Sequence, residues 1–430
     1  MRLIQLFRSV SDRFGVYPVL VLAALLRLAN LGYPKSLVFD ETYYVKDAYT
    51  LWQAGHELQW TKGANEKFIS GDFSGHTDVA EFVVHSPLGK WLIGLGMHVF
   101  GPSNPIGWRI VPALAGIASV GLLYLIALKL FGSKRWALVP AFLLAIDGQA
   151  IVISRTAILD GLVAFFILLG FWIFLRTLDH KKPWKLFLLL GAVFGVGAGV
   201  KWTALVFFAV FIGYYLLHVG FRKFWVALVS LPALVLAYLA TWTGWFVSRG
   251  WGYRDGDVLN SFIDYHRQIW QFHSNLASPH PYKSPAITWL ADLRPTSFFW
   301  ESKDGFATAI NPIGNPVLWW GGIVALGFLV SWFFRNRDKL SVLVLTGYLA
   351  GWVPWLIYSE RTAFQFYSVA FEPWIALAIT LMAIRYRTQK LVVYSAVAAL
   401  AFTVFFLPLY LAISAPLWVW QIHMWLPSWI

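Results

Sequence analysis

The stretch GLVAFFILLGFWIFL, residues 161–175, contains no charged side chain, and LFLLLGAVFGVGAGV, residues 186–200, repeats the same character. Of the 430 residues, 59% are hydrophobic and only 13% are charged. That is too little polar surface to enclose a water-soluble core of this size. The apolar runs do not alternate with polar residues as the strands of a membrane barrel do. We therefore predict an all-α integral membrane protein, because helices satisfy their own backbone hydrogen bonds in lipid.

The apolar runs predict about eleven membrane-spanning helices, since a helix needs roughly 20 mostly apolar residues to cross a bilayer. The predicted spans are residues 17–31, 109–130, 136–153, 161–175, 186–200, 204–219, 224–247, 317–334, 340–357, 366–384 and 391–413. No tandem repeat or low-complexity linker divides the chain. We expect residues 1–430 to form a single polytopic membrane domain.

Lysine and arginine collect in short loops between the spans, which is typical of cytoplasmic loops. These residues are Arg2, Arg8, Arg13, Lys129, Lys134, Arg135, Arg176, Lys181, Lys182, Lys185, Arg222, Lys223, Arg335, Arg337, Lys339, Arg385, Arg387 and Lys390. They all fall on one side only if residues 85–101 lie on the outer surface as an interfacial helix. A multi-pass plasma-membrane protein is then expected, with a cytoplasmic N-terminus. The C-terminus and the loops 32–108 and 248–316 are extracytoplasmic.

Composition also argues against other classes of protein. The net charge of +13 comes from clusters between apolar runs rather than from one solvated face, so we expect no nucleic-acid partner. The chain has no cysteine, which excludes disulfides, thiolate nucleophiles and cysteine-ligated metals. A secondary transporter would explain buried charges, but it predicts related halves and broken helices at mid-bilayer. Here the polar residues concentrate at one face.

An acidic motif, FDETYY at residues 39–44, follows the first predicted span. We predict a helix that starts at Asp40, runs to residue 52 or 53 and stops near Gly55. Asp40, Tyr44 and Asp47 then share one face. Two readings of Asp40 and its neighbour Glu41 remain open. They either cap and charge the start of the helix, or supply a carboxylate that accepts the proton of a hydroxyl nucleophile.

Cationic side chains at the outer ends of the spans could hold a leaving phosphate. The candidates are His85, Lys90, Arg155, Lys201 and Arg361. Interfacial lysines also snorkel to lipid headgroups, which would explain Lys90 or Lys201 without any function. Arg155 could instead form a structural pair with Asp160 in the same turn. Asp147 either faces the same external cavity or pairs within the helix bundle.

Taken in order along the chain, these motifs resemble the protein O-mannosyltransferases, glycosyltransferase family 39 of the C-type integral-membrane superfamily. The resemblance rests on FDE at 39–41, HSPLGK at 85–90, RTAILD at 155–160, VKWT at 200–203, NPIGNP at 311–316 before Trp319 and Trp320, and the terminal residues 424–430. It implies the eleven-span C-type architecture with an amphipathic helix in the first external loop.

The resemblance also implies a chemistry. The donor would be polyprenyl-phosphate mannose, and mannose would pass with inversion to Ser or Thr of translocated proteins. Asp40 and Glu41 match the family's acidic pair, with Asp40 as the base, and Arg155 matches an arginine that serves the donor phosphate. Asp160, Asp147 and Tyr44 are expected to support the site.

The sequence departs from the family's pattern in two places. Ser86 stands where the family often has proline, which bears on the rigidity of that turn. Residues 248–316 are too short for the eukaryotic insertion, so the chain resembles the bacterial, actinobacterial form. We expect the bilayer and the secretion machinery as partners, and no cofactor or metal. The alternative is another polyprenyl-phosphate-sugar transferase acting on lipid or glycan. The motif at residues 311–320 favours the protein mannosyltransferases.

Overall fold

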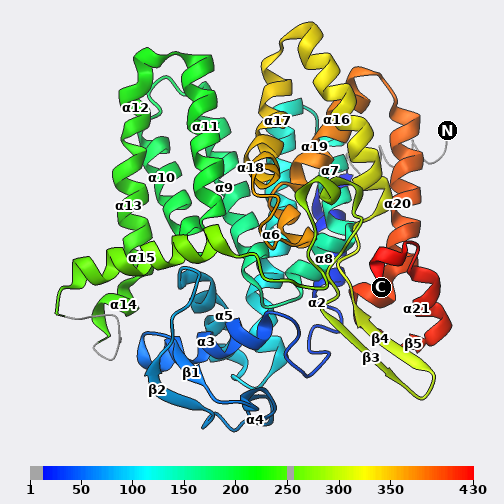
Figure 1. The fold of residues 1–430 in the computed structure, drawn as a ribbon. Helices are drawn as coiled ribbons and strands as arrows, with labels where there is room; N and C mark the ends of the chain where they lie inside the picture. Colours follow the sequence, from blue (N-terminus) through cyan, green and yellow to red (C-terminus); the bar gives the residue numbers. More distant parts are fainter. Residues whose placement is uncertain (1–12, 249–255) are drawn as a thin grey trace.

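The computed structural model of the protein describes residues 13–248 and 256–430 (Figure 1). The predicted cytoplasmic residues Arg2 and Arg8, and part of the loop 248–316, lie outside these ranges. Within them the chain forms a helical bundle with the strand-containing segments gathered at one end. The bundle agrees with the predicted all-α class.

Each predicted span coincides with a helix or with a series of short helices. The bundle helices are α2 (Tyr17–Leu28), α6 (Pro105–Phe131), α7 (Lys134–Ile146), α8 (Gly148–Ser154), α9 (Leu159–Asp179), α10 (Trp184–Ala198), α11 (Thr203–Val219), α12 (Phe224–Leu228), α13 (Ser230–Thr241), α14 (Thr243–Val247), α16 (Pro316–Asn336), α17 (Lys339–Gly351), α18 (Val353–Ile357), α19 (Glu372–Arg385) and α20 (Gln389–Tyr410). The 3-10 turns η1 (Phe221–Lys223) and η3 (Gln365–Ala370) precede α12 and α19.

Helix length separates two groups of predicted spans. Among the described residues, five helical stretches are long and apolar enough to cross a membrane alone: α6, α9, α16, α20 and Phe224–Thr241. The pair α7 and α8 passes the same test together, bent by 62° at Asp147. The bend has a local cause, because the Asp147 carboxylate accepts hydrogen bonds from Gln149 N and Ala150 N and so caps a new helix. The remaining predicted spans fall on shorter helices, and the count of eleven stays a prediction.

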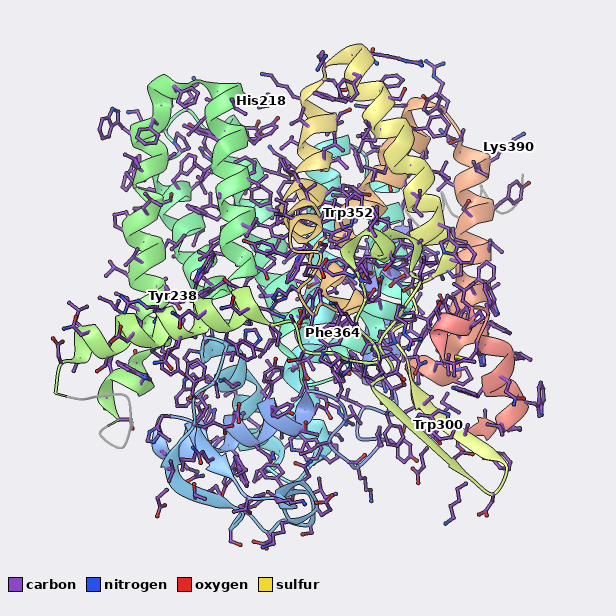
Figure 2. All side chains as sticks on the ribbon, viewed as in Figure 1. His218, Tyr238, Trp300, Trp352, Phe364 and Lys390 are labelled. Atoms are coloured by element: carbon purple, nitrogen blue, oxygen red, sulfur yellow. The ribbon has the colours of Figure 1, made fainter. Side chains whose placement is uncertain are left out.

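The basic loops meet at one end of the bundle. Lys129 at the end of α6 pairs with Asp179 at the end of α9, and Arg385 at the end of α19 pairs with Asp338 before α17. Figure 2 shows His218 and Lys390 at this end and Trp300 toward the opposite end. This is the segregation that the one-sided placement of Lys and Arg predicts.

The first external loop is a small folded unit. It contains α3 (Glu41–Ala54), β1 (Leu58–Trp60), α4 (Ala64–Ser70), β2 (His76–Ala80) and α5 (Leu88–Phe100). Strands β1 and β2 pair antiparallel. The predicted helix after the acidic motif is confirmed, since α3 ends where Gly55 adopts the left-handed conformation (φ 78°) that glycine tolerates best. The predicted helix in residues 85–101 is α5, which lies beside α3 (Figure 1).

The second external segment crosses the end of the bundle and carries strands that the sequence did not predict. Its elements are α15 (Val258–Asn275), η2 (Ala286–Ala291), β3 (Phe299–Lys303) and β4 (Phe306–Ile310). The C-terminal segment adds β5 (Ala415–Pro416), α21 (Leu417–His423) and η4 (Pro427–Trp429). The strands form an antiparallel sheet in the order β3-β4-β5. A two-residue turn joins β3 to β4, where Asp304 and Gly305 both have positive φ, as such hairpins require.

Aromatic rings fill the centre of the bundle. Trp374 of α19 is fully buried against Phe171, Phe207 and Phe211, with ring centroids 5.0 to 6.3 Å apart. Gly347 of α17 leaves the space that this indole occupies, because a Cβ there would meet the ring at 2.0 Å. Such packing holds α9, α11, α17 and α19 together, and the site described next lies near one end of these helices.

Candidate active site

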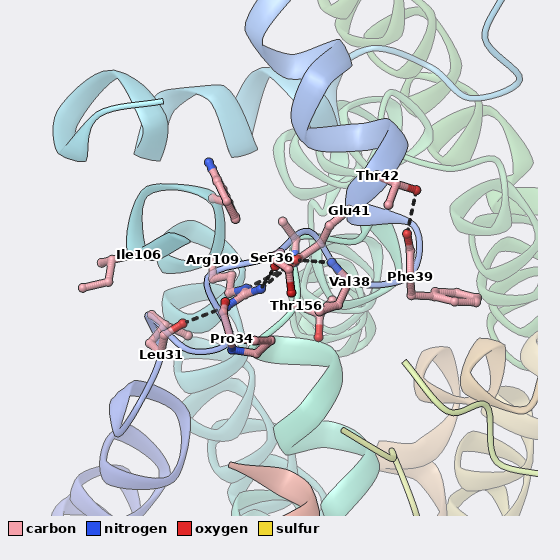
Figure 3. Close-up of polar contacts among 12 residues, drawn as sticks. Leu31, Pro34, Ser36, Val38, Phe39, Glu41, Thr42, Ile106, Arg109 and Thr156 are labelled. Atoms are coloured by element: carbon pink, nitrogen blue, oxygen red, sulfur yellow. Dashed lines mark hydrogen bonds and ion pairs between the residues drawn. The ribbon is translucent and has the colours of Figure 1, made fainter. Parts of the chain in front are cut away.

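Glu41, the first residue of α3, is completely buried and forms an ion pair with Arg109 (Figure 3). Its two carboxylate oxygens accept Nε and Nη2 of Arg109, each at 2.8 Å. They also accept the backbone N–H groups of Val38 at 3.0 Å and Ala157 at 2.9 Å. Arg109 further donates to the carbonyls of Leu31, Pro34 and Ser36. The pair therefore fixes the loop that leads into α3, and Glu41 has no oxygen left for a substrate.

Asp40 has different surroundings although it is the next residue. It stands at the N-cap position of α3, yet its side chain makes no capping hydrogen bond. Desolvation and the neighbouring carboxylate of Asp160 raise the pKa of Asp40 to about 7, against the opposing effect of Lys201. The capping interpretation of Asp40 is wrong for the side chain. A carboxylate with a pKa near neutrality and no committed partner is suited to accept a proton.

Lys201 and Asp160 form a buried ion pair beside Asp40. Lys201 lies in the turn between α10 and α11, Asp160 lies in the first turn of α9, and Nζ to Oδ1 measures 2.8 Å. The ammonium also lies 4.4 Å from the centre of the Tyr367 ring. Burial alone would lower the pKa of Lys201, but the combined effect of Asp160, Tyr367 and Asp40 outweighs it, so the pKa is raised and the lysine is charged. The alternative in which Asp160 pairs with Arg155 is not the arrangement found, because Asp160 pairs with Lys201.

A pocket of about 330 Å³ opens next to this pair. Three predicted cations line it: His85, Lys201 and Arg361. Its wall toward the bundle is apolar and comes from α11, α17 and α18, with Leu205, Val206, Ala350, Pro354 and Trp355. A cavity that is cationic at one end and apolar at the other fits an amphipathic anion such as a lipid phosphate.

Arg361 is positioned with one donor to spare. Its Nε donates to the carbonyl of His273 at 2.7 Å, its Nη2 lies 3.0 Å from His273 Nδ1, and the guanidinium stacks 4.9 Å from the Trp355 ring. Nη1 is buried and has no hydrogen-bond partner among the described residues. A buried guanidinium N–H without a partner is costly, and a phosphate oxygen in the pocket would satisfy it.

The histidines of the pocket are not cations in this arrangement. The rings of His85 and His273 lie 5.0 Å apart. Burial, together with Lys201 and other nearby cations, holds the pKa of His85 well below its usual value, and burial lowers the pKa of His273 to about 4. His85 therefore lies where it was predicted but as a neutral hydrogen-bonding group. Tyr44, also predicted, has its ring 6.2 Å from that of His85.

Lys90 and Arg155 are not in the pocket. Lys90 is buried in the first external loop, where it pairs with Glu57 and lies 4.0 Å from Asp47. Arg155 donates to the carbonyls of Leu26, Arg27 and Ala29, so it caps the C-terminal end of α2. Both were expected to hold the donor phosphate, and both are instead committed to partners that the sequence order did not reveal.

Asp147 also lies away from the pocket. It is fully buried between α7 and α8 and accepts hydrogen bonds from Asn315 N at 2.8 Å and Trp319 Nε1 at 3.1 Å. The expectation that it faces the external cavity is wrong, and its alternative, pairing within the bundle, holds. The hydrogen bonds from Asn315 and Trp319 to Asp147 hold the start of α16 against the bend between α7 and α8. The NPIGNP motif, which contains Asn315, therefore has a structural role.

Sequence reasoning missed Arg109, His273 and Tyr367. Arg109 was taken as the first residue of a span, although a charge at the start of an apolar helix is a signal that a buried partner exists. Tyr367 and His273 carried no such signal, because Tyr367 lies far along the chain from its partner Lys201, and His273 lies far from its partner Arg361.

Comparison with known proteins places this geometry in a family. Residues 84–245 match the family described as dolichyl-phosphate-mannose-protein mannosyltransferase, and residues 258–429 match the C-terminal four-span region of protein O-mannosyltransferase. The chain belongs to the protein O-mannosyltransferase family.

Relatives in the family cover nearly the whole chain. The polyprenol-phosphate-mannose–protein mannosyltransferase of Mycobacterium tuberculosis is 27% identical over 96% of this chain and 90% of its own. The protein of the same name from Corynebacterium glutamicum is 28% identical over 91% and 88%. The predicted resemblance to the actinobacterial form is confirmed by these relatives.

Solved structures share the fold. The Saccharomyces cerevisiae protein O-mannosyltransferase Pmt1-Pmt2 complex bound to the sugar donor aligns with a TM-score of 0.72 at 14% identity, covering 98% of this chain and 93% of that one. ArnT from Cupriavidus metallidurans bound to undecaprenyl phosphate aligns at 0.62 and 16%, over 92% and 76%. The family member described here therefore has the C-type glycosyltransferase fold.

Proposed function

We propose that this protein transfers mannose from a polyprenyl-phosphate-mannose donor to Ser or Thr hydroxyls of translocated proteins, at the outer face of the membrane. One observation carries the proposal. The carboxylate of Asp40, which has no hydrogen-bond partner among the described residues, interacts electrostatically with Lys201. Lys201 lines a pocket that is also lined by Arg361, which has an unpaired donor, and by apolar side chains. This arrangement supplies a base, a phosphate site and a lipid groove in one place.

The donor would bind with its phosphate toward the cations and its isoprenoid chain toward the bundle. Arg361 Nη1 and Lys201 Nζ would hold the phosphate oxygens, with neutral His85 as a further hydrogen-bonding group. The first isoprene units would lie against Leu205, Val206 and Trp355. The relatives from Mycobacterium tuberculosis and Corynebacterium glutamicum, both named polyprenol-phosphate-mannose–protein mannosyltransferase, support this donor.

The reaction would proceed as an in-line displacement. The acceptor oxygen forms a bond to the anomeric carbon as the bond from that carbon to the phosphate oxygen breaks, which inverts the configuration. The hydroxyl proton passes to the Asp40 carboxylate, and the bonding electrons leave with the lipid phosphate. The negative charge that develops on the phosphate is stabilised by Arg361 and Lys201, so no carboxylic acid is needed for the leaving group.

Glu41 has a positioning role in this proposal rather than a catalytic one. Its ion pair with Arg109 holds the backbone from Val38 through Asp40, and so it sets where the base stands. Asp160 holds Lys201 and tunes the pKa of Asp40. The sidedness follows from the basic loops, which we assign to the cytoplasm, and acceptors would arrive from the secretion machinery.

The acceptor distinguishes this function from that of another polyprenyl-phosphate-sugar transferase. Purified full-length protein in lipid nanodiscs is incubated with radiolabelled polyprenyl-phosphate mannose, a Ser/Thr-rich peptide, and a lipid extract as competing acceptor. We expect label on the peptide hydroxyls. Label that enters only lipid or glycan would overturn the protein-acceptor assignment.

A further inference from the structure

Strand β3 has a backbone edge that faces no other strand. The sheet order is β3-β4-β5, so β3 is an outer strand, and in Figure 1 it is the strand nearest the first external loop. The two-residue turn makes Lys303 and Phe306 a hydrogen-bonded pair, and the alternation of an antiparallel ladder then turns the N–H and C=O groups of Trp300 and Ser302 outward. Nothing in the described parts of the chain pairs with these outward groups.

The same strand leads directly to the proposed base. Phe298, immediately before β3, stacks on Phe39 with ring centroids 4.7 Å apart and 4° between the planes. Phe39 is the residue before Asp40, and Phe366 packs edge-on against both rings at 5.5 Å. The start of β3 and the start of α3 are therefore held together by one aromatic cluster.

We infer that the free edge of β3 binds an extended segment of the acceptor polypeptide, as an added antiparallel strand that leads an acceptor Ser or Thr to Asp40. The inference rests on the proposed function, since it names how that function's acceptor is held. A strand rises about 3.3 Å per residue, so the edge from Ser302 to Phe298 spans about 13 Å. A chain paired with Trp300 and Ser302 that continues past Phe298 reaches the Phe39–Asp40 corner.

Edge pairing also suits the chemistry of the acceptor. Backbone hydrogen bonds hold a strand without requiring a particular sequence, which suits an enzyme whose acceptors share only a hydroxyl side chain. An extended segment exposes its Ser and Thr side chains on either face, whereas a folded helix would bury its backbone groups in its own hydrogen bonds. Trp300, which is 51% exposed, offers apolar contact to whichever side chain lies opposite.

A disulfide trap tests the pairing directly, because the chain contains no cysteine. Ser302→Cys is incubated in nanodiscs with Ser/Thr peptides that carry one cysteine at successive distances from the acceptor hydroxyl. We expect trapping at one register, repeated at every second residue. The matched control is Phe306→Cys, which is also exposed on the same hairpin but lies on β4. No trapping at Ser302→Cys, or equal trapping at both positions in every register, would overturn the inference.

Kinetics give an independent test with a conservative control. Ser302→Pro removes the outward N–H, a change that an edge strand tolerates, and Ser302→Ala removes only the hydroxyl. We expect Ser302→Pro to raise the KM for peptide by about 3- to 10-fold, as the loss of one hydrogen bond would, with kcat and donor affinity unchanged. Ser302→Ala should behave like the parent. A folded Ser302→Pro protein with the parental KM for peptide would contradict edge pairing. If instead the unmodified protein transfers mannose to no peptide at all, the proposed function is contradicted.

Discussion

At the scale of single residues, the contrast between Asp40 and Glu41 shows how two adjacent carboxylates acquire different roles. Glu41 is surrounded by four donor groups, two of them on the Arg109 guanidinium, whereas Asp40 has a raised pKa and no hydrogen-bond partner among the described residues. Both oxygens of Glu41 are occupied by these donors. The desolvated carboxylate of Asp40 is available to a substrate, and for this reason we propose Asp40 as the base.

Glu41→Gln should reduce stability rather than act on chemistry alone. The substitution removes the charge that compensates Arg109, and breaking a buried ion pair in this way costs about 3 kcal/mol. We expect a clearly lower midpoint of thermal unfolding in nanodiscs, while Asp40→Asn stays close to the parent. Equal unfolding midpoints for Glu41→Gln and the parent would show that the Glu41–Arg109 ion pair does not stabilise the folded protein.

The pH dependence of transfer tests the environment of Asp40. A base must be ionised to accept a proton, so the rate should fall as pH drops through about 7, the raised pKa of Asp40, and level off above it. Asp160 raises that pKa, so Asp160→Asn should move the acid limb of the profile to lower pH. The same substitution frees Lys201 from its ion pair, and the positive charge of Lys201 also lowers the pKa of Asp40. A limb that stays in place, or moves upward, would contradict the assignment.

At the scale of elements, local signals predicted well and tertiary partners did not. Apolar runs located each bundle helix, and the acidic motif with Gly55 located both ends of α3. Arg155 and Lys90 were misassigned because a charged side chain is satisfied by whatever folds against it, here the end of α2 and Glu57. The strands β3 and β4 were missed because each has only five residues and neither alternates: most side chains of β3 are exposed, and most of β4 are buried. Lys201 and Arg361 were correctly predicted to lie close together. Both follow predicted spans on the same side, and in the fold these ends of the spans converge on one pocket.

Two arginines should therefore respond differently to truncation. Arg361→Ala removes the proposed phosphate donor in the loop after α18 and should raise the donor KM by about 10- to 100-fold, with partial rescue by lysine. Arg155→Ala removes the cap of α2 and should cost about 2 kcal/mol of stability with donor KM near the parental value. Titration of labelled donor against both folded variants checks this. A donor defect confined to Arg155→Ala would return the phosphate role to that residue.

At the scale of the whole molecule, the bundle separates a basic end from an end that carries the site. Single cysteines can report which end is which, because the parent chain has none. We expect Lys390→Cys to react with a membrane-impermeant maleimide only after cells are lysed, and Trp300→Cys to react on intact spheroplasts. Replacement of Lys339 at the basic end should leave transfer unchanged. The reverse labelling pattern would invert the proposed topology.

The most direct test of the central claim is the single-turnover rate of mannose transfer by Asp40→Asn, with donor bound and peptide saturating. Asparagine keeps the size of the side chain and leaves the Glu41–Arg109 ion pair intact, but it cannot accept the hydroxyl proton. The account predicts a folded protein that binds donor like the parent and transfers roughly 100- to 10,000-fold more slowly. A rate within a few-fold of the parent would show that Asp40 is not the base and that the site has been assigned to the wrong group.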